Sequence, residues 1–288
     1  MSLPHIFGPL TGQVPLANLD DNFNALVSLV STSVAPAGTN NFRLVLSGGN
    51  LTLQPVNGNN VDINGTIYSY TAMPILSASG LTPATLYYIY LTDILGIATL
   101  EASATGYTTD AKGRDYKTGD PTRRLVGQGY PTAGPAWTLS NAQALVRTRN
   151  NRVTVVLSNA FAANRQTASA TFVELSNTER VEFLCWSDEA WPMHITGSVN
   201  NNAVGGQTFC CIGCDNVNAT DGGIELDNPT GLTLNSMSLG ITTILSGMTD
   251  GFHYATILGR VGSGTATWQG SATVGGRVSL QGVIVPIS

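Results

Sequence analysis

The stretch "VEFLCWSDEAWPMHITGSV", residues 181–199, carries the pattern that decides the fold of this chain. Two runs rich in apolar and aromatic residues flank the polar letters "SDE", and runs of this kind bounded by turn residues are typical of β-strands. Asp188 and Glu189 are therefore expected in a turn between two strands. Similar short runs, broken by Gly, Asn and Asp, fill the chain beyond about residue 158. Many short strands without an intervening helix predict an antiparallel sandwich or jelly roll.

A second group of strand patterns precedes this region. "FRLVL" and "LTLQP" on either side of "SGGN" predict a hairpin that begins at Phe42. "ATLYYIYL" and "IATLEAS" predict another, while the polar, turn-rich residues 106–124 are expected to form a loop. These patterns predict a small antiparallel β domain before the sandwich.

One helical pattern stands at the front, in "TGQVPLANLDDNFNAL", residues 11–26. Apolar residues recur there at spacings of three and four, as in the seam of a packed helix. They are Leu16, Leu19, Phe23, Leu26 and Val30. Pro15 suits a first turn, and Asp20 and Asp21 favour the helix dipole near its N-terminal end. Two heptads are too short to be stable alone, so this stripe is expected to dock on something.

The predicted organisation is mainly β in three parts. Residues 1–40 form a helical anchoring segment and linker, residues 41–150 a small β-rich domain, and residues 151–288 a jelly-roll-like β domain. Whether the last two pack together is left open.

Composition excludes several classes of function. Of 288 residues only 11% are charged, lysine occurs only at positions 112 and 117, and the net charge is −5. With no basic run, a surface that follows nucleic-acid phosphates is not expected. No stretch approaches the ~20 apolar residues of a membrane span, so no membrane insertion is expected. The start "MSLPHIFGPLTG" lacks the features of a signal peptide.

No motif for catalysis is found. Phosphate-binding glycine loops, H-E-x-x-H and G-x-S-x-G are absent from the sequence. Ser246, Asp250 and His253 are close in sequence, but a catalytic triad is defined by geometry, so a packed strand histidine is the preferred interpretation. Acidic pairs suited to glycan hydrolysis are not assigned, although five candidates exist. These are Glu174, Glu179, Glu182, Asp188 and Glu189. We expect no enzymatic activity, no catalytic residue and no cofactor.

Cysteines and tryptophans leave two interpretations open. Cys185, Cys210, Cys211 and Cys214 could supply a zinc site, but neighbours in a strand point to opposite faces, which favours buried thiols and no metal. Trp186 and Trp191 could stack on a sugar, fill a subunit interface or occupy ordinary core positions.

Three stretches resemble virion proteins of tailed bacteriophages, especially tail fibres. "LTGQVPLANLDDNFNAL" is similar to their G-x-[IV]-P-L-x-x-L-D-x-N-F phrase. Residues 80–127 look like a module of phage tail and head-surface proteins. "VEFLCWSDEAWPMHITGSV" and "GFHYATILGRVGSGTATWQG" look like a C-terminal domain similar to the trimeric C1q/TNF-type jelly roll. The matching positions of the first phrase are Gly12, Val14, Pro15, Leu16, Leu19, Asp20, Asn22 and Phe23.

The resemblance implies a non-enzymatic virion protein, assembled in the host cytoplasm. It would be a homotrimeric short tail fibre or fibre adaptor that binds a tail hub or adaptor and displays its β domains to a host-surface glycan or another fibre. The alternatives are a decoration protein that binds the capsid and a glycan-degrading tailspike. Anchoring would involve Pro15, Leu16, Leu19, Asp20, Asn22, Phe23, Leu26 and Val30. Phe252, Tyr254 and Ile257 are candidates for the trimer interface. For the eight apolar or aromatic positions among these, packing inside one chain is the alternative. They are Leu16, Leu19, Phe23, Leu26, Val30, Phe252, Tyr254 and Ile257.

Overall fold

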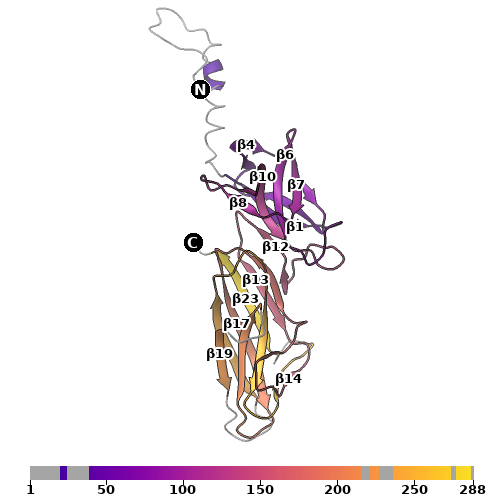
Figure 1. Cartoon of the computed structure of the whole chain (residues 1–288), viewed down its shortest axis with the longest axis vertical. Coiled ribbons are helices and arrows are strands. Elements are labelled where there is room, and N and C mark those ends of the chain that lie inside the picture. Colours follow the sequence, from indigo (N-terminus) through magenta and orange to yellow (C-terminus); the bar gives the residue numbers. More distant parts are fainter. Residues whose placement is uncertain (1–19, 25–38, 216–220, 227–235, 274–276, 287–288) are drawn as a thin grey trace, which may run out of the picture.

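The computed structural model describes residues 20–24, 39–215, 221–226, 236–273 and 277–286. The molecule is elongated and mainly β, with a short helical segment at residues 20–24 at one end of the long axis (Figure 1). The predicted fold class, a mainly β chain with an N-terminal helix and a C-terminal sandwich, is confirmed. Among the described residues, none of the helical segments is long and apolar enough to cross a membrane.

Three sheets build the part that we call the small β unit. Their strand orders are β1-β2-β5, then β7-β6-β10-β9-β8 with β12 beside β10, and the pair β3-β4. The strands are β1 (Phe42–Ser47), β2 (Asn50–Pro55), β3 (Asn60–Ile63), β4 (Thr66–Ser69), β5 (Ile75–Leu76), β6 (Tyr87–Ile94), β7 (Ile97–Ser103), β8 (Tyr107–Thr109), β9 (Asp115–Lys117), β10 (Asp120–Gly129) and β12 (Val146–Thr148).

Two six-stranded sheets build the part that we call the C-terminal sandwich. One has the order β11-β16-β21-β18-β19 with β15 beside β21, and the other β13-β23-β17-β22-β14 with β20 beside β17. The strands are β11 (Gln143–Ala144), β13 (Val155–Ala160), β14 (Arg165–Thr167), β15 (Val173–Glu174), β16 (Val181–Cys185), β17 (Glu189–Asn201), β18 (Thr208–Cys214), β19 (Asp221–Leu226), β20 (Met237–Leu245), β21 (Gly251–Val261), β22 (Ala266–Trp268) and β23 (Ser279–Pro286).

The two predicted hairpins are confirmed, and the predicted loop is wrong. β1 and β2 pair from Phe42 opposite Pro55 to Ser47 opposite Asn50. Residues 106–124, expected as a loop, instead contain β8, β9 and the start of β10. Some of their turn residues form the tight turn between β8 and β9, where Asp110 accepts hydrogen bonds from the backbone N–H groups of Lys112 and Arg114. The others form the turn between β9 and β10, where Lys117 pairs with Asp120. Strands of three residues around such a turn are too short to show a period of two.

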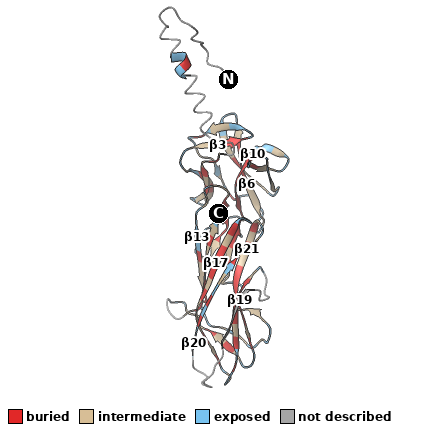
Figure 2. Cartoon of the chain, turned by 90° about the vertical axis from the view of Figure 1, so that its left-hand side faces the viewer, coloured by how far each residue is buried: buried red, intermediate tan, exposed pale blue. Residues whose placement is uncertain are grey.

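The two parts have separate hydrophobic cores. In the sandwich, the inward residues of both sheets form one cluster that includes Phe183, Trp191 and Ile257. The small β unit has its own cluster, which includes Phe42, Ile89 and Trp137. Figure 2 shows buried residues along the strands of both parts. The chain crosses between the parts more than once, because β11 of the sandwich precedes β12 of the small β unit.

Gly197 is a position in β17 where only glycine fits. Its φ is +144°, and an added Cβ would lie 2.6 Å from the Cα of Val278. We expect Gly197→Ala to lower the free energy of unfolding by roughly 1–3 kcal/mol, because backbone on the neighbouring segment must move and the conformation is disfavoured for L-residues. Denaturant unfolding would measure the change.

The matched control is Gly240→Ala on the adjacent strand β20, where an added Cβ meets nothing within 4 Å. It should change stability by much less. Equal losses for the two variants would contradict this account of β17.

Candidate functional site

The junction between the two parts brings together buried aromatic and charged side chains from both. Trp186 follows β16 of the sandwich and packs with Tyr90 and Leu125 of the small β unit. Its ring meets that of Tyr107 edge-on at a centroid distance of 5.9 Å, and its indole N–H donates to the Thr148 carbonyl at 2.8 Å. This large side chain is therefore both buried and hydrogen-bonded.

A buried ion pair crosses the same junction. Arg147 of β12 and Glu189 of β17 have side chains that are 2% and 0% exposed. Arg147 Nε lies 3.1 Å from each carboxylate oxygen of Glu189, and its Nη1 donates to the Val153 carbonyl at 2.9 Å. Glu189 Oε2 also accepts the backbone N–H of Trp186 at 2.9 Å. A buried pair needs such additional hydrogen bonds to offset the loss of water.

Further contacts tie the junction at its rim. Arg152 binds both oxygens of Asp188 at 2.6 Å, and these hydrogen bonds, against burial, hold the pKa of Asp188 below its usual range. Gln128 donates to the Cys185 carbonyl at 2.8 Å. The rings of Tyr130 and Phe252, one from each part, stack with centroids 4.4 Å apart.

Arg149 and Asp250 link the two parts through aromatic side chains. The Arg149 guanidinium lies 4.9 Å from the centroid of the Trp186 ring and also binds Asp115 at 2.7 Å. Asp250 accepts hydrogen bonds from the Tyr107 hydroxyl at 2.7 Å and from the Ser187 N–H at 2.6 Å. Burial, and then the hydrogen bond to Asp250, raise the pKa of Tyr107. These contacts fix the position of the two parts relative to each other.

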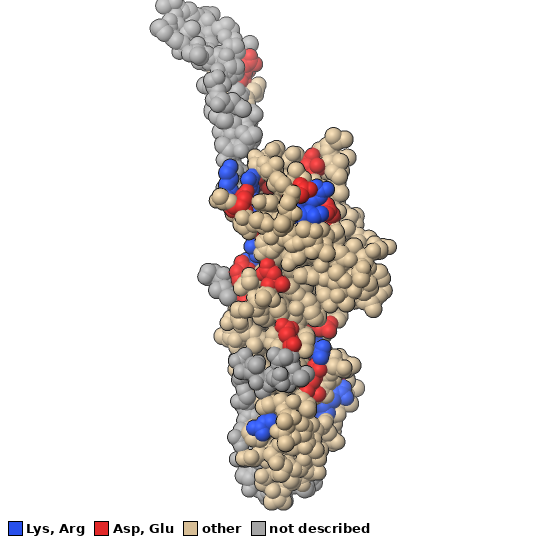
Figure 3. Space-filling model, viewed as in Figure 1, with Lys and Arg blue, Asp and Glu red and all other residues tan. Residues whose placement is uncertain are grey.

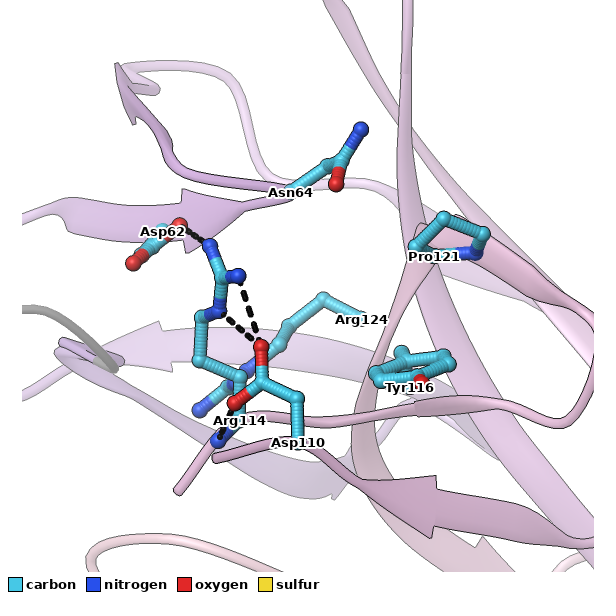
Figure 4. A pocket seen from close by; sticks show the side chains of 7 residues that line it. All are labelled: Asp62, Asn64, Asp110, Arg114, Tyr116, Pro121 and Arg124. Atoms are coloured by element: carbon cyan, nitrogen blue, oxygen red, sulfur yellow. Dashed lines mark hydrogen bonds and ion pairs between the residues drawn. The ribbon is translucent and has the colours of Figure 1, made fainter. Parts of the chain in front are cut away.

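A charged hollow lies on the small β unit (Figure 4). Arg114 spans it, with Nη1 3.3 Å from Asp62 Oδ1 and Nε 2.6 Å from Asp110 Oδ2. Arg124 is 2% exposed, and burial lowers the pKa of its guanidinium. The hollow encloses about 10 Å³, which is room for about one water molecule. Its charges hold β3 to the β8–β9 hairpin.

The histidine that the sequence placed beside Ser246 and Asp250 binds other residues. His253 Nδ1 lies 2.5 Å from Asp215 Oδ2, and Nε2 lies 2.8 Å from the Thr249 carbonyl. A carboxylate and a carbonyl both accept hydrogen bonds, so this geometry favours a ring that carries both protons. Burial opposes this charge, but the hydrogen bonds, that to Asp215 foremost, raise the pKa of His253 to about 10. Asp250 is used at the junction instead.

The candidate carboxylates of the sequence are held by basic or amide side chains. Glu174 binds Arg180, Glu179 binds Arg165 and Glu182 binds Gln143. Asp188 and Glu189 lie in the junction, as described above. Trp186 and Trp191 are both fully buried, so they occupy core positions and not a sugar-binding surface.

The cysteines are free thiols in the sandwich. Cys185, Cys210 and Cys211 are fully buried, and Cys210 belongs to the core between the sheets. Burial raises the pKa of Cys210 to about 12 and that of Cys211 to about 11. Over the described parts of the chain, no group of three or more His, Cys, Asp or Glu side chains is placed to hold a metal ion.

The predicted anchoring residues lie only partly in the described chain. Asp20, Asn22 and Phe23 belong to the helical segment 20–24, where Phe23 is 65% exposed and Asn22 is buried. Five further anchoring residues lie outside the described residues. They are Pro15, Leu16, Leu19, Leu26 and Val30.

The three candidates for a trimer interface have partners within the chain. Ile257 is 3% exposed and belongs to the sandwich core, so its side chain packs inside one chain. Phe252 stacks on Tyr130, and Tyr254 lies 3.9 Å below the Arg180 guanidinium. Phe252 and Tyr254 are half-buried, and a trimer contact there stays a prediction.

Sequence reasoning missed Arg147 and its role. "LVRT" places a charged residue in an apolar strand, and a buried arginine requires a carboxylate partner. That signal was present, but it does not identify Glu189, which is 42 residues away along the chain.

Comparisons with known proteins find no close relative. No family model matches the chain, and no curated protein matches it. A solved structure of infectious bursal disease virus, Gx strain, is 13% identical over 85% of this chain and 66% of that chain, with a TM-score of 0.28. The insecticidal delta-endotoxin Cry8Ea1 from Bacillus thuringiensis is 9% identical over 90% of this chain and 55% of that chain, with a TM-score of 0.29.

A VP2 subviral particle of infectious bursal disease virus is 12% identical over 91% of this chain and 86% of that chain, with a TM-score of 0.28. At such TM-scores the likenesses establish neither a shared fold nor a shared function. This chain spans about two thirds of the first of these three proteins and about half of the second.

The junction yields a prediction about its buried ion pair. We expect Glu189→Gln to lower the free energy of unfolding by about 3–5 kcal/mol, because it leaves Arg147 buried without its counter-charge. Asp188→Asn is the control. The Asp188 side chain is 47% exposed, so solvent screens its charge, and its partner Arg152 keeps Glu189 at 3.2 Å as a second acidic partner. Urea unfolding of both variants would decide. A Glu189→Gln loss no larger than the control would contradict a stabilising role for the pair.

His253 yields a prediction about pH. Its pKa is raised from 6.5 to about 10 in the folded chain, so its stabilisation is complete below pH 6.5 and is lost as pH rises through about 10. Unfolding free energy should fall by at most about 1.4 kcal/mol per pH unit from this group. Urea unfolding between pH 6.5 and about 8, below the range where free cysteine and tyrosine titrate, would measure it. His253→Gln should remove this slope, and an unchanged slope would contradict the assignment.

Proposed function

We propose that this chain is a non-enzymatic structural protein of a tailed-bacteriophage virion, a homotrimeric short tail fibre or fibre adaptor. Residues 1–40 would anchor it to a tail hub or adaptor, and the β parts would meet a host-surface glycan or another fibre. The observation that carries the proposal is the junction. Two β parts are clamped into one elongated body by Arg147, Glu189 and Trp186, with the helical segment 20–24 at the opposite end from the sandwich (Figure 1).

A rigid junction between two domains suits a structural protein, whose parts must keep a fixed arrangement. Interfaces between domains of one chain normally permit relative motion unless they are large and apolar. Here a fully buried ion pair, a stacked aromatic pair and a buried tryptophan oppose such motion. The resemblance of "GQVPLANLDDNF" to phage fibre segments supports an anchor at the other end.

The charge distribution also supports a structural role. Carboxylates that an active site would need are engaged by arginines in the junction and in the charged hollow. Figure 3 shows charged side chains in a few patches where both signs meet, separated by wide neutral areas. Neutral surface suits contacts between copies of a virion subunit.

The test is the location of the protein on particles. Virions would be purified from a lysate of cells that carry this gene and treated with antibodies raised against the purified chain. A small number of antibodies should bind each virion, and they should bind at its tail. Label spread over the head would favour the alternative, a capsid decoration protein. Unlabelled virions would contradict both roles. Release of glycan fragments by the purified chain would contradict the non-enzymatic assignment and favour a tailspike.

A further inference from the structure

The hairpin between β6 and β7 ends in an exposed apolar tip. Leu95 is 97% exposed, Ile97 68% and Ile94 52%, and Ile75 of β5 is 70% exposed nearby in the same unit. Single exposed apolar residues are ordinary, but a contiguous group marks an interaction surface. We call Ile94, Leu95 and Ile97 the hairpin tip.

The backbone of the hairpin tip is unusual for its sequence. Leu95 and Gly96 have φ of +54° and +84°, as in a two-residue type I′ turn. That turn prefers asparagine, aspartate or glycine where Leu95 stands, because a left-handed backbone is disfavoured for leucine. A disfavoured conformation that displays an apolar side chain to water points to a function for that side chain.

Hydrogen bonds to Asp93 hold the hairpin tip in place. Asp93 Oδ1 accepts the Gly96 N–H at 2.9 Å, and Oδ2 accepts the hydroxyl of the buried Tyr70 at 2.8 Å. Both carboxylate oxygens are thus used within the chain. Bracing of this kind lets the tip present a fixed shape to a partner.

A hollow lies directly beside the tip. Residues 69–74 and 96–98 line a concavity of about 350 Å³, with Ala72, Met73 and Pro74 on one side and Ile97 and Ala98 on the other. A projecting leucine and a hollow of this chemistry therefore share one patch. A patch that carries both a projection and a hollow suits an isologous two-fold contact, in which the same surface of both copies is self-complementary.

The lack of charged residues in the hairpin tip and its hollow limits the kinds of partner that can bind there. The tip and the lining residues of the hollow include no Lys, Arg, Asp or Glu. A surface for an anionic membrane or nucleic acid would need basic residues. Because the chain carries a net charge of −5, copies of it approach most readily through a neutral face.

The position of the patch leaves it accessible. β6 begins beside the junction, where Tyr88 packs with the Trp186 cluster. Six residues of strand separate Tyr88 from Ile94, or about 20 Å, so the tip points away from the sandwich. It is therefore distinct from the junction and from the candidates on β21.

We propose that the hairpin tip and its hollow form a self-association surface in which Leu95 of one copy enters the hollow of a second copy. This contact goes beyond the proposed function, since it requires no virion and does not use residues 1–40.

The decisive variant is Leu95→Asn in the full-length chain. Asparagine followed by glycine is the preferred type I′ pair, so the variant should be at least as stable as the parent chain to urea. Its assembly should nevertheless be weaker, and the concentration at which half of the chains are associated should rise about tenfold or more. Sedimentation velocity over a dilution series would measure association.

Val204→Asn is the matched control. Val204 is 75% exposed and also precedes a glycine of positive φ, but it lies in the loop between β17 and β18. It should leave association unchanged. Weaker association for Leu95→Asn alone, with stability retained, supports the surface.

Two results would overturn the proposal. One is a full-length chain that stays monomeric at every concentration, which would leave a different protein as the occupant of the patch. The other is an assembled chain whose association Leu95→Asn leaves unchanged. The first result would also contradict the homotrimer of the proposed function, whereas the second would leave the homotrimer intact and remove only this contact. Neither result bears on the labelling of virions, which tests the virion role by itself.

Discussion

The buried pair of Arg147 and Glu189 is the constraint on which the arrangement of the molecule depends. Each charge, once removed from water, costs several kcal/mol unless the other is in place. Arg147 enters from the small β unit and Glu189 from the first residue of β17, so the pair forms only when the two parts are seated. The pair also orders Trp186 and the Val153 carbonyl through direct hydrogen bonds. The position of the two parts relative to each other is therefore set by this ion pair and its hydrogen bonds.

Charged residues are few in this chain, and many of them form ion pairs within it. The sequence has 13 basic and 18 acidic residues, and many of the arginines bind carboxylates within the chain. What remains outside is a largely neutral surface built from small polar residues, with apolar exceptions such as the hairpin tip. A surface of this kind gives little long-range steering but permits close contact between like-charged copies. The small number of charges, paired inside the chain, thus supports both the rigid arrangement of the two parts and contact between copies.

Sequence patterns predicted the elements better than their assembly. The alternation around "SGGN" was enough to predict the β1–β2 hairpin, because turn chemistry and period agree there. The hairpin of β8 and β9 was missed, since three-residue strands leave no period to detect. Ile257 was a candidate for a trimer interface, with packing inside one chain as the alternative, and it lies in the core. Strand patterns alone do not distinguish the two faces of a β-strand. The junction could not be predicted, since its partners are 42 residues apart in sequence and meet only through the sheets.

The two unusual local features of the chain have opposite physical explanations. Gly197 stands where backbone on the neighbouring segment leaves no room for a Cβ, so the structure itself requires glycine. At Leu95 the backbone would accept a smaller polar residue more readily, and the described residues leave the leucine 97% exposed. Packing explains the first position and fails to explain the second. A residue that its own fold neither requires nor favours is best explained by something outside the chain. For this hairpin, the neutral patch and adjacent hollow make a second copy the partner that fits best.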